Sequence, residues 1–284
     1  MKDVPLYTGD EVYRPFWEDD SALLEVSLGC SWHGCRFCDF ACDSFHLFSV
    51  EEIEEKAKKL VPYAQGKKRL FLLGDNPFVL DTPKLLAVFD IVERYLPWIE
   101  EISMYARFDD VLRKAPQELG ILRRKGLVHL HIGMESGCDP LLKWMNKGTD
   151  AGQARQACNL LHDAGITFSV SVIPGLGGKK LTEAHAKDTA ALLNDTQPER
   201  LWLIGLKVWP NTPLAAMCET GEFVPLTPRE RLLEIRCMME DLELAGCAFA
   251  ATTVLDQYTL MGRLPEHKKT FLSQMDDLLA HSQG

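Results

Sequence analysis

The sequence contains no long apolar run, and this absence excludes a membrane-spanning protein. No uninterrupted apolar stretch among the 284 residues is long enough to cross a bilayer. The first twenty residues also lack the apolar core that a secretory signal needs. We therefore expect a cytoplasmic protein that has no membrane partner.

Basic residues are fewer than acidic ones, which argues against a general nucleic-acid binder. Lys and Arg total 31 against 41 Asp and Glu, so the formal net charge is −10. Proteins that bind nucleic acid through its phosphates need a basic surface, which this composition does not favour. Nucleic acid is therefore not an expected partner, although RNA stays open as a substrate.

The cysteines are too unevenly placed for a disulfide-stabilised secreted domain. Such domains are shorter and more uniformly rich in cysteine than this chain, which has nine. Three of them, Cys30, Cys35 and Cys38, fall within nine residues, and Cys42 lies just beyond. This grouping indicates a metal site in a protein of a reducing compartment.

Short apolar strands alternate with amphipathic helices over most of the chain. We expect strands at residues 22–28, 69–73, 101–105, 127–133, 167–173 and 200–208. Helices are expected between them at residues 50–60, 83–96, 116–125, 153–164 and 182–193. Six such units require right-handed crossovers and a parallel sheet. They are too few for a closed eight-stranded barrel and suit a partial (β/α)6 TIM-like barrel or an open doubly wound sheet, both α/β folds.

The alternation stops after Pro213, which sets the predicted domain boundaries. Residues 1–20 are expected to form an N-terminal extension, residues 21–215 the barrel and residues 216–284 a small, mainly helical C-terminal extension. Within this last part, a capping box from Thr227 to Glu230 opens a helix that runs to about residue 245. A final helix is expected at residues 266–280.

Most predicted strands alternate apolar and polar residues, unlike the continuous apolar runs of strands buried on both faces. The apolar set would pack on the helices and the polar set would face inward, so we infer a wide, solvent-accessible lumen that serves as the substrate cavity. Because both signs of charge face this lumen, we expect a polar, ionised substrate. The candidate pocket residues are Tyr105, His129, His131, Lys207 and Trp209, each of which is alternatively a satisfied interior polar group.

The cysteine group lies in the loop after the first predicted strand, at the end where barrel enzymes place their chemistry. Closely spaced thiolates on one loop suit a soft metal or an iron–sulfur cluster. Spacing alone leaves open a zinc site with His33 or His46 as the fourth ligand. It also leaves open a different trio in which Cys42 replaces Cys30.

The cysteine loop resembles the cluster loop of the radical S-adenosylmethionine (SAM) superfamily. Its residues 29–40, GCSWHGCRFCDF, are similar to the GCPWNxCxFC form of one uncharacterised branch, although the usual family spacing is C-x3-C-x2-C. The resemblance continues at the ends of the later strands and implies the partial barrel. The matching segments are LGDN at 73–76, YARFD at 105–109, GMESG at 133–137, IPGLGG at 173–178 and WPNTP at 209–213.

The resemblance implies that Cys30, Cys35 and Cys38 hold an oxygen-sensitive [4Fe–4S] cluster whose fourth iron binds SAM. Reduction of SAM would then give methionine and a 5′-deoxyadenosyl radical, which removes a hydrogen atom from the substrate. The reaction would need an electron donor such as flavodoxin or ferredoxin as a partner.

The same resemblance assigns SAM contacts to residues at the strand ends. Gly74 and Asp75 match the segment that receives the SAM ammonium group, and Phe37 matches the position whose backbone meets the adenine. Further contacts are implied for Arg107 with the SAM carboxylate, for Glu135 and Ser136 with the ribose or methionine moiety, and for Ile173 and Gly175 beside the adenine.

Three alternatives stay open on these observations. Arg107 is alternatively a substrate anchor or a structural ion-pair partner of Asp109 or Asp110. The leading expectation is a small polar substrate, whereas a member that modifies tRNA or a peptide would usually carry an extra domain. A non-catalytic iron–sulfur or zinc sensor or scaffold is the different-class alternative, but it has no need of residues such as Asp75 and Glu135.

Overall fold

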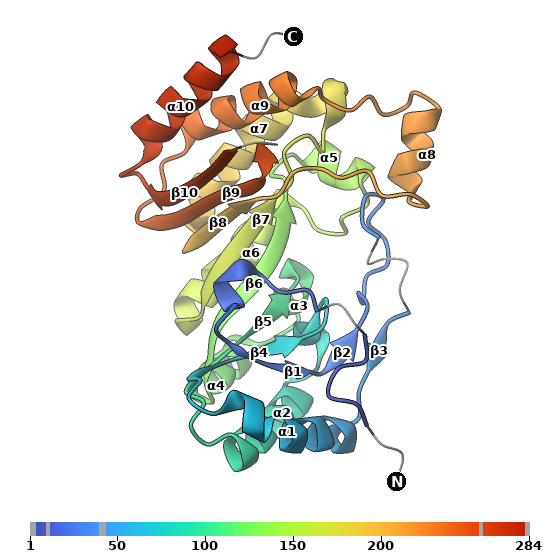
Figure 1. Ribbon diagram of the computed structural model, residues 1–284, viewed down its shortest axis with the longest axis vertical. Coiled ribbons are helices and arrows are strands. Elements are labelled where there is room, and N and C mark those ends of the chain that lie inside the picture. Colours follow the sequence, from blue (N-terminus) through green and yellow to red (C-terminus); the bar gives the residue numbers. More distant parts are fainter. Residues whose placement is uncertain (1–3, 10–11, 40–43, 256–257, 282–284) are drawn as a thin grey trace. The chain divides into compact units, whose positions relative to one another are not determined.

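The computed structural model describes residues 4–9, 12–39, 44–255 and 258–281, and the chain divides into two compact units. The first unit comprises residues 1–33, 40–132 and 159–167, and the second comprises residues 34–39, 133–158 and 168–284. Eight strands form one sheet in the order β1-β4-β5-β6-β7-β8-β9-β10 (Figure 1). The registered neighbours are parallel except β9 and β10, which are antiparallel. The predicted α/β class with a mostly parallel sheet is confirmed.

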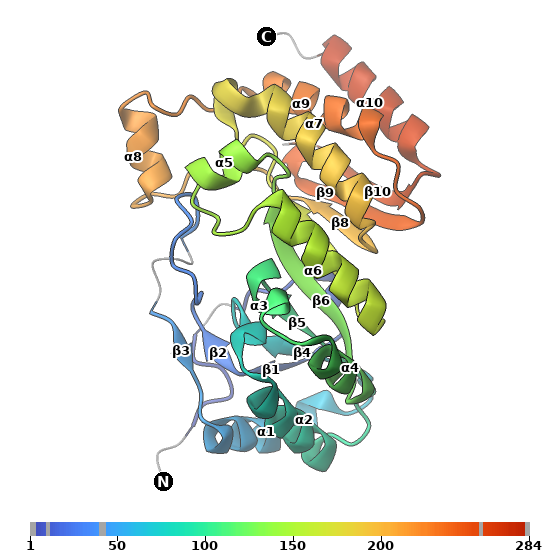
Figure 2. The same ribbon diagram turned by 180° about the vertical axis from the view of Figure 1, so that it is seen from behind.

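The first unit is built on the strands β1, β4 and β5 and on the first part of β6. Helices α1 and α2 lie side by side in both views, and α1 also packs on β1 (Figures 1 and 2). The element bounds are β1 Ala22–Glu25, β2 Ser27–Leu28, β3 His46–Leu47, α1 Val50–Ala64, β4 Arg69–Leu73, α2 Thr82–Tyr95, β5 Glu101–Ala106, α3 Phe108–Leu112, α4 Pro116–Arg124 and β6 Leu127–Glu135, with short 3-10 helices at Phe16–Glu18 and Pro77–Val79.

Helix α1 begins where the sequence predicts, because its start is set by local hydrogen bonds. The Ser49 hydroxyl accepts a hydrogen bond from the backbone N of Glu52 at 3.2 Å. The Glu52 carboxylate in turn accepts one from the backbone N of Ser49 at 2.8 Å. This capping box satisfies two amide groups that the helix itself leaves without partners. The buried face of α1 then carries Ile53, Ala57 and Leu60 against the rest of the first unit.

The second unit contains the end of β6, all of β7 after its first residue, and the C-terminal strands. Its helices α7, α9 and α10 pack in succession, with α9 in contact with both of the others. The element bounds are α5 Asp139–Trp144, α6 Ala151–Ala164, β7 Thr167–Val172, α7 Gly178–Thr196, β8 Arg200–Leu203, α8 Pro213–Glu219, α9 Pro228–Asp241, β9 Cys247–Leu255, β10 Tyr258–Leu264 and α10 Lys268–His281. The last part of α6 belongs to the first unit.

Two predicted strand boundaries need correction, and two strands were missed. The expected strand at residues 22–28 is divided, because Ser27 and Leu28 leave the main sheet and pair with β3. The sixth strand ends at Leu203 rather than at residue 208. No strand was expected after it, yet β9 and β10 extend the sheet beside β8. Alanine has a low strand propensity, so the alanine-rich β9 owes its conformation to pairing with β8 and β10.

None of the helices in the described residues is long and apolar enough to cross a membrane.

Candidate functional site

The three cysteines of the predicted cluster are partly exposed. Cys30 belongs to the first unit, whereas Cys35 and Cys38 belong to the second. Among the residues that the structure describes, no three His, Cys, Asp or Glu side chains are arranged to hold a metal ion. Cys42 lies outside the described residues. Thiols are the ligands that an iron–sulfur cluster requires, and the assignment of the three ligands stays a prediction.

In the first unit, the segment after β4 closely approaches the start of the cysteine loop. Gly74 has φ +141, and a Cβ atom there would lie 1.9 Å from the Ser27 hydroxyl oxygen, so the approach requires glycine. Asn76 is fully buried and donates from Nδ2 to Ser31 Oγ at 2.8 Å and to Asp110 Oδ2 at 2.6 Å. Its Oδ1 atom is buried without a hydrogen-bond partner. Such an atom carries a desolvation cost that a bound donor would remove.

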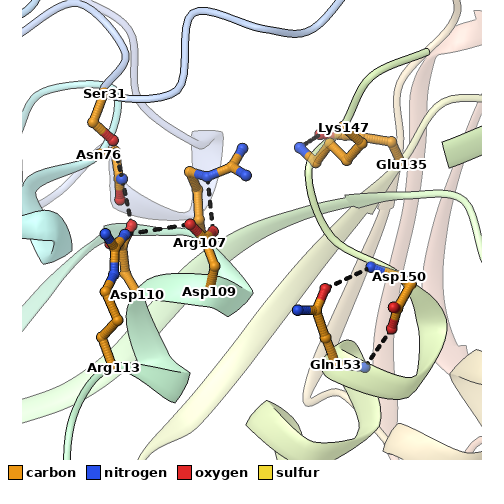
Figure 3. Close-up of polar contacts among 10 residues, drawn as sticks. All are labelled: Ser31, Asn76, Arg107, Asp109, Asp110, Arg113, Glu135, Lys147, Asp150 and Gln153. Carbon is orange, nitrogen blue, oxygen red and sulfur yellow. Dashed lines mark hydrogen bonds and ion pairs between the residues drawn. The ribbon is translucent and has the colours of Figure 1, made fainter. Parts of the chain in front are cut away.

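Arg107 follows β5 and contacts Asp109 in the same unit (Figure 3). Its Nε donates to Asp109 Oδ1 at 2.9 Å, and its guanidinium carbon lies 5.0 Å from the centre of the Trp32 ring. The structural ion pair that we considered for Arg107 is therefore present with Asp109. Asp110 is buried and pairs with Arg113 instead. Burial raises the pKa of Asp110, and the Asn76 hydrogen bond opposes this effect.

Tyr105 is a partly exposed phenol at the end of β5. Burial, followed by the negative charges of Asp75 and Glu18, raises its pKa well above the ordinary value of 10.0. The phenol therefore stays protonated at neutral pH and can donate a hydrogen bond. Its ring meets that of Phe71 edge to face at 5.3 Å between centres.

The two histidines predicted to face a lumen are buried and hydrogen-bonded. His131 Nε2 lies 2.7 Å from Glu18 Oε1, and His129 Nδ1 lies 2.7 Å from Thr167 Oγ1. Ser103, on the neighbouring strand, is also buried. The expected solvent-accessible lumen is therefore wrong for this part of the first unit, because the segment before β1 supplies Glu18 to the polar face of the strands. His131 matches the alternative of a satisfied interior group.

In the second unit, Glu135 closes β6 in a strained conformation. Its φ is +63, in the region that favours glycine. Its Oε1 accepts a hydrogen bond from Lys147 Nζ at 3.0 Å, and its Oε2 accepts one from Ser171 Oγ at 3.2 Å. A Cβ atom on Gly133 would lie 2.2 Å from Glu135 Oε1, which explains the glycine. Lys147 was not predicted as a partner of Glu135, since no motif in its local sequence indicates a contact with β6.

Ser136 is fully buried. Its Oγ lies 2.8 Å from His185 Nδ1 and accepts a hydrogen bond from the backbone N of Cys138 at 3.0 Å. Burial lowers the pKa of His185, so the ring is neutral. Because His185 Nε2 lies 3.1 Å from the Ile173 carbonyl oxygen, we assign the proton to Nε2, and Nδ1 accepts from Ser136.

The segment after β7 is held by a buried carboxylate from α9. The backbone N of Gly175 donates to Glu234 Oε1 at 2.6 Å, and Thr182 Oγ1 donates to Glu234 Oε2 at 2.5 Å. Gly175 has φ +91, a conformation that glycine adopts without strain. Glu234 was not predicted, because it lies on α9, which is remote in sequence from the segment after β7.

Phe37 is buried in an apolar cluster of the second unit. Ile173 and the two cysteines Cys35 and Cys38 pack against that cluster. The backbone around Phe37 is fixed by two hydrogen bonds: Arg36 N donates to the Met145 carbonyl at 3.0 Å, and Leu214 N donates to the Arg36 carbonyl at 2.8 Å. The structure thus brings together Phe37 and Ile173, both of which were predicted to lie beside the adenine.

The last two pocket candidates contact each other beyond the end of β8. Lys207 Nζ lies 3.2 Å from the centre of the Trp209 ring, in a cation–π contact. Lys207 is exposed and Trp209 is partly exposed. Their role in substrate binding stays a prediction.

Comparison with known sequences gives one family match and several curated relatives. The model of the radical SAM superfamily matches residues 24–193. Anaerobic magnesium-protoporphyrin IX monomethyl ester cyclase of Cereibacter sphaeroides is 27% identical over 198 residues, which are 68% of this chain and 31% of that protein. The tRNA-2-methylthio-N(6)-dimethylallyladenosine synthase of Methylacidiphilum infernorum is 24% identical over 76% of this chain and 48% of that protein. The chain spans a third to a half of the length of these two relatives.

Comparison with solved structures identifies the fold. Coproporphyrinogen III oxidase (HemN) from Escherichia coli, a radical SAM enzyme, matches with a TM-score of 0.61 and 17% sequence identity. The match covers 78% of this chain and 51% of that chain. At this identity the likeness concerns the fold alone.

Proposed function

Because this chain belongs to the radical SAM superfamily, we propose that it is an enzyme that cleaves SAM reductively at a [4Fe–4S] cluster. In this proposal Cys30, Cys35 and Cys38 hold the cluster. When bound, the cluster and SAM supply an electron and a 5′-deoxyadenosyl radical, which removes a hydrogen atom from a small polar substrate. The described residues bind and orient these groups.

One observation carries the proposal: four candidate segments lie at the C-terminal ends of β4, β5, β6 and β7, which are neighbouring strands of the main sheet. Glycine is needed at two of these ends, after β4 at Gly74 for close approach to Ser27 and after β7 at Gly175 for its φ of +91. The strand ends after β5 and β6 carry Arg107 and Glu135. Barrel enzymes place their reactive residues at this end of their strands.

The polar residues of the first unit suit the methionine end of SAM. Asp75 is partly exposed beside the buried Asn76 and would accept the SAM ammonium group. Arg107 would hold the SAM carboxylate through its guanidinium group, whose Nε also donates to Asp109. Tyr105 stays protonated and would donate a hydrogen bond to the substrate or to SAM.

The second unit suits the nucleoside part of SAM. Phe37 and Ile173 share one apolar cluster and would flank the adenine. Glu135 keeps both carboxylate oxygens as acceptors and would bind ribose hydroxyls. Ser136 contributes through His185, because its hydroxyl is buried against that ring.

A small polar substrate is the leading proposal, and modification of tRNA is the second candidate. The second rests on the similarity to the tRNA-2-methylthio-N(6)-dimethylallyladenosine synthase. The net charge of −10 favours the small substrate, since a protein that binds tRNA through its phosphates needs a basic surface. The reaction needs a low-potential electron donor such as flavodoxin or ferredoxin, and we place the protein in the cytoplasm because a reducing compartment preserves the cluster.

The test is anaerobic reconstitution of the full chain with iron and sulfide, followed by reduction in the presence of SAM. We expect four irons per chain and formation of 5′-deoxyadenosine in the wild type. Cys35→Ala should abolish the product, whereas Cys42→Ala should not. Cys237→Ala is the matched control, because it removes another partly exposed thiol, in α9, that is outside the loop.

Two results would contradict the proposal. Stoichiometric zinc in place of iron would favour the sensor or scaffold alternative. A cluster that forms but never cleaves SAM would do the same. If Cys42→Ala rather than Cys30→Ala abolishes cluster binding, the activity stands but the ligand trio is wrong.

A further inference from the structure

The two residues that follow Cys30 are each held by the end of a different strand in the first unit. Ser31 Oγ accepts a hydrogen bond from Asn76 Nδ2 at 2.8 Å, and Asn76 follows β4. The Trp32 ring stacks with the Arg107 guanidinium at 5.0 Å, and Arg107 follows β5. Cys30 is therefore next to two anchored residues.

Asn76 and Arg107, the two anchors, are each held in turn by an acidic residue of helix α3 (Figure 3). The second hydrogen of Asn76 Nδ2 is donated to Asp110 Oδ2 at 2.6 Å, so the amide nitrogen is fully committed to Ser31 and Asp110. Arg107 is oriented by Asp109, whose Oδ1 accepts from Nε at 2.9 Å. Adjacent acidic residues of one short helix thus orient one anchor each.

Burial makes the Asn76 anchor the stronger of the two. Asn76 and Asp110 have exposed fractions of 0% and 1%. Water cannot replace a hydrogen bond at such depth, so loss of one partner leaves the others without compensation. Trp32 is exposed, and a stacking contact at the surface contributes less.

We propose that Asn76 is a positioning residue, which holds Ser31 and thereby fixes the backbone at Cys30 for the cluster. The inference rests on the proposed function for the identity of the bound group, but the anchor itself is a property of the chain. Residues outside the coordination sphere fix the orientation of the groups that hold a metal, and their loss weakens metal binding. Loss of the anchor should therefore make the cluster more labile without removing a ligand.

The test compares cluster stability in the reconstituted full chain. After addition of air, the cluster absorbance should decay several-fold faster in Asn76→Ala than in the wild type, because a less well-held ligand binds the cluster more weakly. Ser31→Ala should accelerate the decay similarly, and the double variant should be no faster than the more labile single variant, because both changes break the same contact. Ser31→Thr keeps the hydroxyl and should restore the wild-type rate.

A control variant and a second readout separate positioning from general stability. Gln153→Ala removes an exposed polar contact, the 3.1 Å hydrogen bond from Asp150 N, and should leave the decay rate unchanged (Figure 3). Amide hydrogen exchange of the peptide covering residues 27–33 should be faster in Asn76→Ala, while exchange in α6 stays the same. A purely structural role would lower the unfolding midpoint without changing the cluster decay rate measured well below that midpoint.

The proposal is overturned if the decay rates match the wild type, or if the Asn76→Ala and Ser31→Ala effects are additive. The exchange measurement does not need the cluster. It therefore tests the anchor even if the wild type fails to hold iron, a result that would remove the proposed function instead.

Discussion

Glu18, in the segment before the first strand, places its Oε1 atom 2.7 Å from Nε2 of His131 inside the first unit. The other carboxylate oxygen accepts a hydrogen bond from Ser21 Oγ at 2.5 Å and lies 3.4 Å from Arg69 Nε. Glu18 is fully buried, so its charge is compensated by these groups rather than by water. Glu18 is therefore an internal residue of the first unit.

Removal of the Glu18 carboxylate should strongly destabilise the first unit. Glu18→Ala leaves His131 and Arg69 without their buried partner, and breaking a buried ion pair costs about 3–5 kcal/mol. Glu101→Ala is a matched control, because Glu101 also contacts Arg69 at 3.4 Å but is half exposed. The control should cost less than about 1 kcal/mol. Urea unfolding of both variants measures the difference, and equal losses would show that Glu18 does not act as a buried partner.

The same carboxylate should make stability fall in acid. Burial by itself raises the pKa of Glu18, but the hydrogen bond and charge of His131 and the contacts with Ser21 and Arg69 outweigh it, so the pKa lies below the ordinary value of 4.5. A carboxyl whose pKa is lowered on folding stabilises the protein above its unfolded pKa, and this stability is lost as the pH falls through the folded value. Glu18→Gln should therefore show a smaller loss of unfolding free energy between pH 6 and pH 3.5. Parallel pH curves for the two proteins would refute this assignment.

The elements that sequence predicts well are those that local interactions define. Strand β4 was predicted at residues 69–73 and the structure has it at Arg69–Leu73. The starts of α1 and α9 follow from capping boxes, whose partners are three residues apart. Strands β9 and β10 were missed, because the alanine-rich β9 joins the sheet by pairing with β8 from a distant part of the chain, and β10 in turn pairs with β9.

In the candidate site, too, local motifs were predicted from the sequence and contacts between remote residues were not. Strand-end motifs place Gly74, Asp75 and Glu135 correctly after β4 and at the end of β6, since a motif is a local pattern. Their partners are remote in sequence: Glu18 lies 113 residues before His131, and Glu234 lies 59 residues after Gly175. No periodicity or spacing rule connects such positions, so only the folded structure identifies them.

Gly137 should be intolerant of any side chain, because it touches helix α7. A Cβ atom there would lie 2.3 Å from the Asp188 carbonyl oxygen and 2.7 Å from the Thr189 Cα. Backbone atoms of a helix cannot give way cheaply, so Gly137→Ala should cost about 2–3 kcal/mol or more. It should also weaken the 2.9 Å hydrogen bond from Gly137 N to Thr189 Oγ1.

Gly221→Ala provides the control for this change. Gly221 has φ +75 and open space around it, so alanine there meets only the conformational penalty of about 1–2 kcal/mol. Unfolding of both variants by urea should rank Gly137→Ala as clearly less stable. If the two cost the same, the close approach of Gly137 to α7 does not exist in solution.

Lys147 should be essential for the stability of the second unit because it compensates Glu135. Lys147→Met keeps the length and apolar character of the side chain but leaves the buried carboxylate without its cation, at a cost of about 3 kcal/mol or more. Lys187→Met is the matched control, since Lys187 pairs with Glu183 at 2.8 Å on the exposed surface of α7 and should cost less than about 1 kcal/mol.

The double variant Glu135→Gln/Lys147→Met distinguishes a compensated charge from simple packing. Without the carboxylate, loss of the ammonium group leaves no unpaired charge, so the double variant should be more stable than Lys147→Met alone. Thermal unfolding of the four proteins in the cycle measures the coupling between the two residues. Additive losses would mean that the 3.0 Å contact between Lys147 Nζ and Glu135 Oε1 contributes nothing to stability.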